Sequence, residues 1–477
     1  MDRPSRTFVR TVPVLDRYDL VVCGGGPSGI PAALAASREG LKVLLVEQTG
    51  QLGGVGTSAG VSHLLGGRLP DNSGWCVAGI FKELVEGLAA RGGAIDPRTI
   101  RGERFSPFGW TGKVSSITYG VPFDPIAMAA YLDERMLEAG VDVLYFTAFV
   151  DVERDAAGQR VERVVLFNKS GLHAYACAAV VDATGDADVA ARAGCPVVKG
   201  RPEDGLMTPA TLMFHVDRVD QDTLAGEIYR TGSNRFRELI ANLRALGEWD
   251  FPYEIFITVQ LHEKGTLMVN TTRICDVDGT DGRSLSRGMM QGRREVQRLF
   301  ALMRKHFPGF ADARIKLVAP VLGVRETRRI VGNYVYSVAD VLAARDFEDT
   351  IGFSGYPWDL PDPQRPSHQP LHERKVGLPR PATPIPYRVL VPRGVANVIC
   401  PGRAISVERD VLGPLREMGP CYAMGHAAGL ASVPVAREGV AYAEVNVEAL
   451  KIRLRADGAA VDAPIHDPGI GLVATIV

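Results

Sequence analysis

Three glycines and one glutamate stand at the spacing of a dinucleotide-binding turn. Gly24, Gly26 and Gly29 form a GxGxxG pattern directly after the apolar run 18–23. The first glycine permits a tight turn, the second lets the backbone approach a pyrophosphate, and the third lets helix and strand pack closely. Glu47 follows near the spacing expected of an acid that binds a ribose hydroxyl. The pattern therefore predicts a dinucleotide site, and the alternative is a glycine-rich turn in an unrelated α/β protein.

Two other residues are candidates for acid–base chemistry. His63 follows a glycine-rich stretch and titrates near neutrality, so it is a candidate base or covalent attachment point for a cofactor. Tyr356 lies among glycine, proline and tryptophan, a composition typical of a pocket-lining loop, and its phenol is a candidate general acid. The alternative for both residues is a packing role.

A dense charge cluster contains Arg325, Glu326, Arg328 and Arg329. An arginine fork can bind a substrate carboxylate bidentately, which makes Arg325 a candidate catalytic residue. The alternative is a structural ion-pair network, which we favour for Glu326 and at least one of the arginines. Arg409, shortly before the last long helix, is the fourth candidate catalytic residue.

The seven cysteines are scattered and include no CxxC pair. This spacing predicts free thiols in a reducing cytoplasm, with neither a metal site nor a redox disulfide. Cys421 falls near the start of a helix, where a thiolate would be stabilised. His426, on an alanine- and glycine-rich helix, is expected to be a packing or surface residue.

The elements that must position these residues alternate between strand and helix. The first are a strand over 18–23, a glycine turn, a helix over 30–39 and a strand over 42–46, which together make a βαβ unit. The later ones are a helix over 123–139, strands over 141–149, 161–168, 174–182 and 395–400, and a helix over 414–438.

The pattern changes from about residue 199, where strand-like pieces at 210–216 and 266–270 alternate with helices such as 284–307. A proline-rich stretch over 357–386 is expected to be an ordered loop or lid. The predicted class is α/β, with a Rossmann-like dinucleotide-binding domain containing a parallel sheet and an inserted α+β substrate domain. The expected boundaries are 1–198 with 386–458 for the discontinuous first domain, 199–385 for the insert and 459–477 for a C-terminal tail.

Composition limits the class of protein further. The chain has 477 residues, of which 46% are hydrophobic and 23% charged, with a formal net charge of -1. This balance is typical of a globular enzyme and argues against a nucleic-acid or anionic-membrane partner. No apolar run is long enough to span a bilayer, and the first residues lack the apolar core of a secretory signal. A cytoplasmic protein is expected, and a homo-oligomer is left open.

The sequence from about residue 10 to 458 resembles the FAD-dependent oxidoreductase family, which belongs to the glutathione-reductase-type flavoprotein superfamily. The resemblance is carried by VVCGGGPSGIPAALAASREGLKVLLVEQTGQLGG, DATGD over 182–186, GVRETRRI over 323–330 and NVICPGRAIS over 397–406. It is thin across 200–310. The sequence departs from the pattern of the family at Pro401, at Arg409 with Asp410, and at Pro420. These positions are expected to lie beside the flavin ring, so the substrate of this chain cannot be inferred from relatives.

The resemblance implies FAD as the cofactor, and a long dinucleotide needs more than one glycine loop. It also implies that the helix beginning near Arg416 points its N-terminus at the flavin. The residues expected to contact FAD are Gly24, Gly26, Pro27, Ser28, Gly29, Glu47, Gln48, Gly53, Gly54, Thr57, Val150, Ala183, Gly185, Asp186, Gly402, Arg403, Met418 and Gly419.

The expected reaction is removal of a hydride from a small polar organic substrate, with the reduced flavin reoxidised by O2 or an electron carrier. No second GxGxxG offers a separate NAD(P)H site. The alternatives are a flavin-dependent monooxygenase, a non-redox flavoprotein, or a subunit of a larger redox complex. The substrate is not specified, because the resemblance is thinnest in the insert, where specificity would lie.

Overall fold

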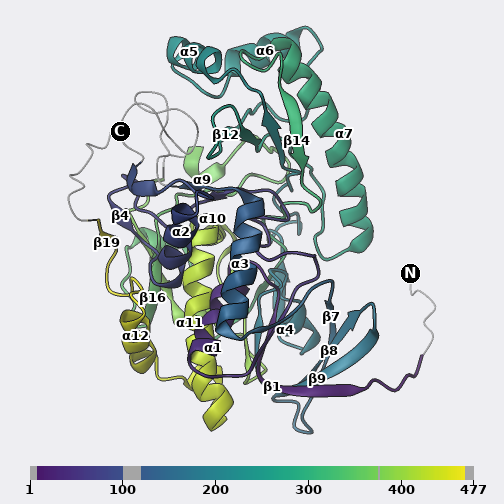
Figure 1. Ribbon diagram of the computed structural model, residues 1–477, viewed down its shortest axis with the longest axis vertical. Coiled ribbons are helices and arrows are strands. Elements are labelled where there is room, and N and C mark those ends of the chain that lie inside the picture. The colour runs from purple at the N-terminus through teal and green to yellow at the C-terminus, as the bar shows by residue number, and fades with distance from the viewer. Residues whose placement is uncertain (1–7, 100–119, 374–375, 468–477) are drawn as a thin grey trace.

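A seven-stranded sheet lies in the lower half of the molecule (Figure 1), and the computed structural model describes residues 8–99, 120–373 and 376–467. The strand order is β6-β2-β1-β9-β8-β7, and β18 also pairs with β9. The pairs of β1 with β2 and β9, of β2 with β6 and of β9 with β18 are parallel, whereas β8 pairs antiparallel with β7 and β9. The bounds are β1 Val14–Cys23, β2 Val43–Val46, β6 Asp142–Leu144, β7 Ala148–Arg154, β8 Val161–Asn168, β9 Gly171–Asp182 and β18 Val398–Ile399.

The central strands are apolar on both sides because both faces of the sheet are covered. In β1, Leu20 and Val22 belong to one hydrophobic core, whereas Val21 and Cys23 belong to the core on the opposite face. Strand β9 is long enough to have two neighbours on one edge. Its first half pairs with β8, and Val180 and Val181 pair with β18.

Helices α1 (Gly29–Arg38) and α11 (Met418–Glu438) lie side by side over one face, next to α3 (Pro125–Ala139) (Figure 1). Small residues let α1 and α11 approach closely. A Cβ at Gly425 would lie 2.0 Å from the Ser28 carbonyl oxygen, and one at Gly429 would lie 2.3 Å from that of Ala32. The N-terminal and C-terminal parts of the chain therefore form one body.

A second layer of structure lies above the sheet in Figure 1. It contains an antiparallel sheet of order β12-β13-β11-β14 and has its own hydrophobic core, made mainly of residues between 210 and 322. The bounds are β11 Phe214–Asp217, α5 Gln221–Thr231, α6 Arg237–Ala245, β12 Thr258–Gln260, β13 Leu267–Val269, α7 Gly282–His306 and β14 Arg314–Val318.

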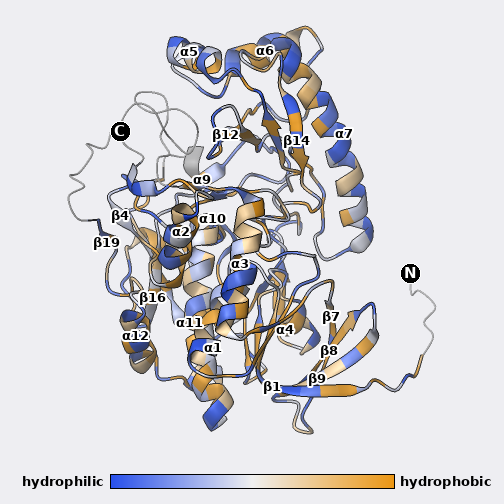
Figure 2. Ribbon diagram, viewed as in Figure 1, coloured by the Kyte–Doolittle hydropathy of each residue, from blue (hydrophilic) through white to orange (hydrophobic). Residues whose placement is uncertain are grey.

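Helix α7 covers this second sheet with one face. Its buried residues recur every three or four positions, among them Gly292, Val296, Leu299 and Met303. Figure 2 shows the corresponding alternation of hydrophobic and hydrophilic segments along the helix. Asp281 caps the helix by accepting from the Ser284 N–H at 2.7 Å.

The remaining elements are shorter or lie outside the two sheets. They are α2 Ile80–Ala90, α4 Asp188–Arg192, α8 Val338–Leu342, α9 Pro370–Glu373, α10 Leu412–Leu415, α12 Val447–Ala456, β3 His63–Leu64, β4 Gly74–Trp75, β5 Val121–Pro122, β10 Val197–Lys199, β15 Arg328–Ile330, β16 Thr350–Ser354, β17 Thr383–Pro386 and β19 Ile465–His466. Strand β10 pairs with β15, β16 with β17, β3 with β5, and β4 with β19.

The predicted α/β class is confirmed. The proline-rich stretch 357–386, expected to be a loop, contains α9 and the buried strand β17, which pairs with β16. The other differences lie at element ends. The expected strand over 141–149 is two strands, because the chain turns at Phe146, whose φ is 50°. The expected helix over 414–438 is α10 and α11, separated at Arg416 and Glu417. The helix over 123–139 begins at Pro125 because the Asp124 side chain caps it.

The division into 1–198 with 386–458, 199–385 and 459–477 stays a prediction. The cores suggest a shorter insert, because Tyr336, Ile351 and Ile385 pack in the core of the first part. We therefore propose residues 210–322 as the compact part of the insert. Within the described ranges, every helix is too short or too polar to cross a membrane.

Asp182, at the end of β9, makes a pH-dependent contribution to stability. Burial raises its pKa from 3.8 to about 6, although the Thr184 hydroxyl and the Ala190 N–H both donate to it. The unfolded chain therefore ionises first as the pH rises, and the native state loses stability between about pH 4 and pH 7. We take the unfolding free energy of the wild type minus that of Asp182→Asn. This difference should fall by about 3 kcal/mol as the pH rises over this range.

The measurement is denaturant unfolding of both proteins at several pH values with saturating FAD. Loss of a hydrogen-bond acceptor in the variant gives an offset that does not depend on pH. A difference that stays constant from pH 4 to 7 would contradict the assignment.

Candidate functional site

One continuous cavity of about 730 Å³ joins the two parts of the molecule. Its lower wall begins where parallel strands end. Gly24 follows β1, Glu47 follows β2 and Ala183 follows β9, and all three line the cavity. The carboxyl edge of such a sheet is where open α/β folds bind their ligands.

The glycine turn after β1 forms a cradle. Gly24 has a φ of +113°, which favours glycine, and a Cβ there would lie 2.3 Å from the Ala183 carbonyl oxygen. A Cβ at Gly29 would lie 1.8 Å from the Gly24 carbonyl oxygen, so this glycine lets α1 start directly on the turn. At Gly26, by contrast, a Cβ would meet no heavy atom closer than 3.9 Å. The Gly26 backbone is therefore open to a ligand.

The start of α1 can receive an anion. Gly26, Pro27 and Ser28 line the cavity, and the Ser28 side chain makes no capping hydrogen bond to the helix. The free N–H groups and the dipole of a helix N-terminus favour a phosphate.

Glu47 is buried, with an exposed fraction of 6%, and it supports the turn. Its Oε2 accepts from the Gly25 N–H at 2.9 Å, and its Oε1 accepts from the Thr49 N–H at 2.7 Å. A carboxylate has about four acceptor positions, so a ribose hydroxyl can still donate to it. The acid thus both shapes the loop and offers a polar contact.

Asp186 and Arg403 close the cavity from two distant segments. The Arg403 Nη2 donates to Asp186 Oδ1 at 2.5 Å, and the Thr327 hydroxyl donates to the same oxygen at 2.6 Å. The Arg403 Nε is buried and has no hydrogen-bond partner among the described residues. Gly185 and Gly402 lie at the bases of these segments, both with positive φ, of 77° and 103°.

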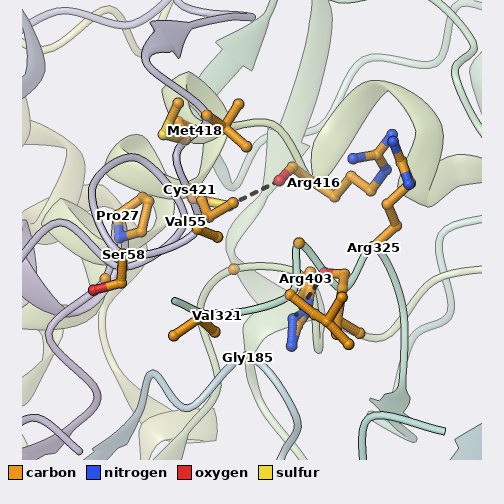
Figure 3. A pocket seen from close by; sticks show the side chains of 18 of the residues that line it. Pro27, Val55, Ser58, Gly185, Val321, Arg325, Arg403, Arg416, Met418 and Cys421 are labelled. Atoms are coloured by element: carbon orange, nitrogen blue, oxygen red, sulfur yellow. Dashed lines mark hydrogen bonds between the residues drawn. The ribbon is translucent and has the colours of Figure 1, made fainter. Parts of the chain in front are cut away.

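Helix α11 directs its N-terminus toward the same cavity, which Met418 and Cys421 line from its first turn. Figure 3 shows the Cys421 side chain beside Arg416, whose carbonyl oxygen accepts from the thiol at 3.4 Å. Burial raises the pKa of Cys421 to about 12, so the thiol stays protonated at neutral pH. The prediction of a stabilised thiolate at this helix start is therefore wrong. The helix dipole remains available to a negative charge on a ligand.

His63 lines the cavity from β3, as its place after the glycine stretch suggested. It is almost completely buried, and burial lowers its pKa to about 3. A pKa so far below neutrality makes the imidazole a poor proton acceptor at pH 7.

Tyr356 and Arg325 also line the cavity, whereas Arg409 does not. The Tyr356 hydroxyl donates to Asp359 Oδ2 at 3.3 Å. Arg409 instead holds the fully buried Glu326, with its Nε 3.0 Å from both carboxylate oxygens, and donates to the Thr208 hydroxyl at 2.8 Å. Its guanidinium is thus committed to an ion pair, which explains why it is not available in the cavity.

Most of the residues expected to contact the cofactor line the cavity, namely Gly24, Gly26, Pro27, Ser28, Glu47, Gln48, Gly54, Ala183, Gly185, Asp186, Gly402, Arg403 and Met418. Gly29, Gly53, Thr57 and Gly419 are not among the lining residues; Gly29 packs on Gly24, Gly53 on Thr57, and Gly419 on Gly67. Val150 is 37% exposed, and its neighbour Phe149 faces the cavity instead. Successive side chains of a strand point to opposite faces, so the Val150 side chain turns away from the cavity, and the cofactor contact expected at Val150 stays a prediction.

Sequence reasoning missed the upper wall, which the insert supplies except for Glu417, the residue before α11. It includes Arg235, Arg273, Asn270, Asp359, Glu417, Met213, Ile257, Val259, Met268, Leu285 and Trp358. The arginines are isolated in sequence and follow no motif, so only the folding of the insert over the sheet brings them together.

Comparison with known proteins shows the family. The chain matches the FAD dependent oxidoreductase family over residues 19–454, and it therefore belongs to that family. It is an FAD-dependent oxidoreductase enzyme. A 53-residue stretch is also 47% identical to dihydrolipoyl dehydrogenase of Trypanosoma brucei brucei, which corresponds to 11% of this chain and 11% of that enzyme.

Two solved structures illustrate distant likenesses. One is p-nitrophenol 4-monooxygenase of Pseudomonas putida DLL-E4, with 13% identity, a TM-score of 0.46, and coverage of 92% of this chain and 86% of that chain. The other is a geranylgeranyl bacteriochlorophyll reductase-like protein of Thermoplasma acidophilum, with 13% identity, a TM-score of 0.44, and coverage of 92% and 84%. At these scores neither likeness bears on reaction or substrate.

The residues of the cavity fit FAD. The open backbone at Gly26 and the uncapped start of α1 suit the pyrophosphate, and Glu47 suits a ribose. The unpartnered Nε of Arg403 and the N-terminus of α11 offer further positive charge along the same cavity. We propose these groups as the contacts of the cofactor.

The two glycines of the turn should respond differently to alanine. Gly26→Ala places a methyl in the open cradle, so FAD affinity should fall about 10- to 100-fold while the apoprotein keeps its stability. Gly29→Ala forces α1 away from Gly24 and should destabilise the apoprotein by about 2 kcal/mol as well.

FAD titration and thermal unfolding of the apoproteins measure the two effects. Gly226→Ala, on the exposed face of α5 with no atom near the added Cβ, is the matched control; it should leave FAD affinity unchanged and should raise the stability of the apoprotein by up to about 1 kcal/mol, because alanine favours a helix. Full FAD occupancy in both turn variants would show that the cradle is misplaced.

Glu47→Ala should weaken FAD binding about tenfold or more, because the Gly25 and Thr49 N–H groups lose their acceptor. Glu47→Gln keeps one acceptor oxygen and should lose less. Turnover at saturating FAD should be nearly unchanged in both variants. A large loss of turnover at full occupancy would contradict a role in cofactor binding.

Proposed function

We propose that this enzyme is a dehydrogenase or oxidase that removes a hydride from a small polar organic substrate bound between the FAD-binding part and the insert. The observation that carries the proposal is the continuity of the cavity, which runs from the glycine cradle to polar side chains of the insert. FAD, when bound, supplies the two-electron acceptor. Electrons then pass from the reduced cofactor to O2 or to an electron carrier.

A polar pair on the insert side of the cavity is suited to take the proton that leaves with the hydride. Tyr356 lines the cavity and donates to Asp359 at 3.3 Å, and Asp359 also accepts from Arg416 Nη2 at 3.2 Å. A substrate hydroxyl or amine that donates to the phenol oxygen can pass its proton toward this carboxylate. His63 is less suited to this role because of its low pKa.

We also propose that the FAD-binding part belongs to the glutathione-reductase-type superfamily. The support is the order of strand, glycine turn, helix, strand and terminal acid, together with the 53-residue match to dihydrolipoyl dehydrogenase. All seven cysteines are free, so the redox chemistry of this chain is assigned to the cofactor and its substrate.

The test is anaerobic reduction of the purified holoprotein by short alcohols, amines, 2-hydroxy acids and amino acids. At least one class should bleach the visible flavin absorbance, and Tyr356→Phe should slow that bleaching about 100-fold or more at unchanged FAD content. Rapid reduction by NADPH, with no organic compound needed, would favour a monooxygenase instead. Flavin that stays oxidised with every compound would overturn the proposal.

A further inference from the structure

Three arginines of the cavity wall carry charges that no carboxylate of the described residues pairs with. Arg235 precedes α6, Arg273 follows β13 and Arg325 precedes β15, and all three line the cavity. Arg273 is 3% exposed, and the other two are half-buried. Charged groups at such depth are normally paired with an opposite charge. A bound ligand is the source of a counter-charge that these three arginines lack within the described residues.

Neutral groups hold Arg273 and Arg325 in place. The Arg273 Nη1 donates to the carbonyl oxygens of Asn270 and Thr272 at 3.1 and 2.9 Å, and its buried Nε has no hydrogen-bond partner among the described residues. Arg325 donates to the Pro209 carbonyl oxygen at 2.5 Å and to the Asn270 amide oxygen at 3.3 Å. These contacts fix the guanidinium groups without neutralising them.

The nearby acids are committed elsewhere. Arg416 pairs with both Asp359 and Glu417, at 3.2 and 2.8 Å. Glu295 interacts with Arg273 and also accepts from the Tyr253 hydroxyl and the Gln291 amide, but burial raises its pKa, which weakens it as a counter-charge. The upper end of the cavity therefore carries an excess of positive charge.

Burial is the main cause of the lowered pKa values of these arginines, and neighbouring guanidinium groups add to it. Burial, together with Arg273 and Arg416, lowers the pKa of Arg325 to about 9, and burial also lowers that of Arg273 to about 10. Figure 3 shows the guanidinium ends of Arg325 and Arg416 next to one another. Like charges this close disfavour one another, and a bound anion would relieve the repulsion that remains after Arg416 has paired with Asp359 and Glu417.

We propose that the substrate is an organic carboxylate, its carboxylate group held by Arg273 and Arg325, with Arg235 adding positive charge. The inference rests on the proposed function for the assignment of the bound acid as substrate. The fork of donors on a guanidinium matches the two oxygens of a carboxylate. Ile257, Val259 and Met268 line the same end of the cavity and can pack against an apolar body. A neutral analogue would leave the arginine charges without compensation.

The first experiment uses the wild-type holoenzyme with oxidised flavin. Benzoate and glutarate are titrated against benzamide and glutaramide, which have similar shapes but no charge, and inorganic phosphate is titrated separately. Binding is read from the change in the visible flavin spectrum and by calorimetry. At least one carboxylate should bind about 10- to 100-fold more tightly than its amide and more tightly than phosphate.

The second experiment repeats the titration with Arg273→Gln and Arg325→Gln. Each should lower carboxylate affinity about 10- to 100-fold at unchanged FAD content, and Arg273→Lys should lose less than Arg273→Gln. Arg293→Gln, on the exposed face of α7, removes the same charge away from the cavity and should have no effect. If a variant fails to fold, the wild-type comparison still decides.

Equal binding of carboxylate and amide, or no binding of either, overturns the inference, as does unchanged affinity in both glutamine variants. Tighter binding of phosphate than of both carboxylates overturns it in favour of a phosphate ester. Failure of the proposed function gives a different result, because the flavin then stays oxidised with every compound tested while carboxylates still bind. Reduction by a neutral alcohol with normal kinetics in Arg273→Gln overturns the inference and leaves the proposed function standing.

Discussion

The contact of Gly29 with the carbonyl of Gly24 fixes where α1 begins, and the rest of the cofactor site depends on that position. A helix displaced by one methyl group would no longer present its N-terminus to the cradle. The same helix packs against α11 through Gly425 and Gly429, where added Cβ atoms would lie 2.0 Å from the backbone oxygen of Ser28, the N-cap residue of α1, and 2.3 Å from that of Ala32. The start of α11, which lines the far side of the cavity, is thus positioned by the same close packing.

The insert is tied to this frame by polar and charged residues that lie next to each other in sequence but have different roles. Glu326 pairs with Arg409, Thr327 donates to Asp186, and Arg328 pairs with Asp188. Arg325, one residue earlier, points into the cavity. The segment therefore connects the two parts through three of its side chains and leaves the fourth to the ligand.

The sequence was sufficient for the parts of the fold that depend on local pattern. Residues 18–47 predicted β1, the glycine turn, α1 and β2, because apolar runs and glycine spacing specify a βαβ unit within a short stretch of chain. Element ends were less accurate where a cap or a turn decides them, as at Asp124 and Phe146. Arg235, Arg273 and Asp359 could not be placed, because they come from separate loops of the insert and meet only after it folds over the sheet. The burial that makes His63 a weak base is likewise a property of the tertiary structure.

The pairing of β9 with two strands on one edge also constrains the order of assembly. Val180 and Val181 pair with Val398 and Ile399, so this edge of the sheet stays incomplete until the whole insert has been synthesised. Contacts of such long sequence separation form slowly, since a long loop must close first. During translation the insert can form its own core before β18 has been synthesised. Gly402 and Arg403 follow β18 directly in the chain and are therefore also synthesised late. Capture of the cofactor is therefore a late event in the biogenesis of this enzyme.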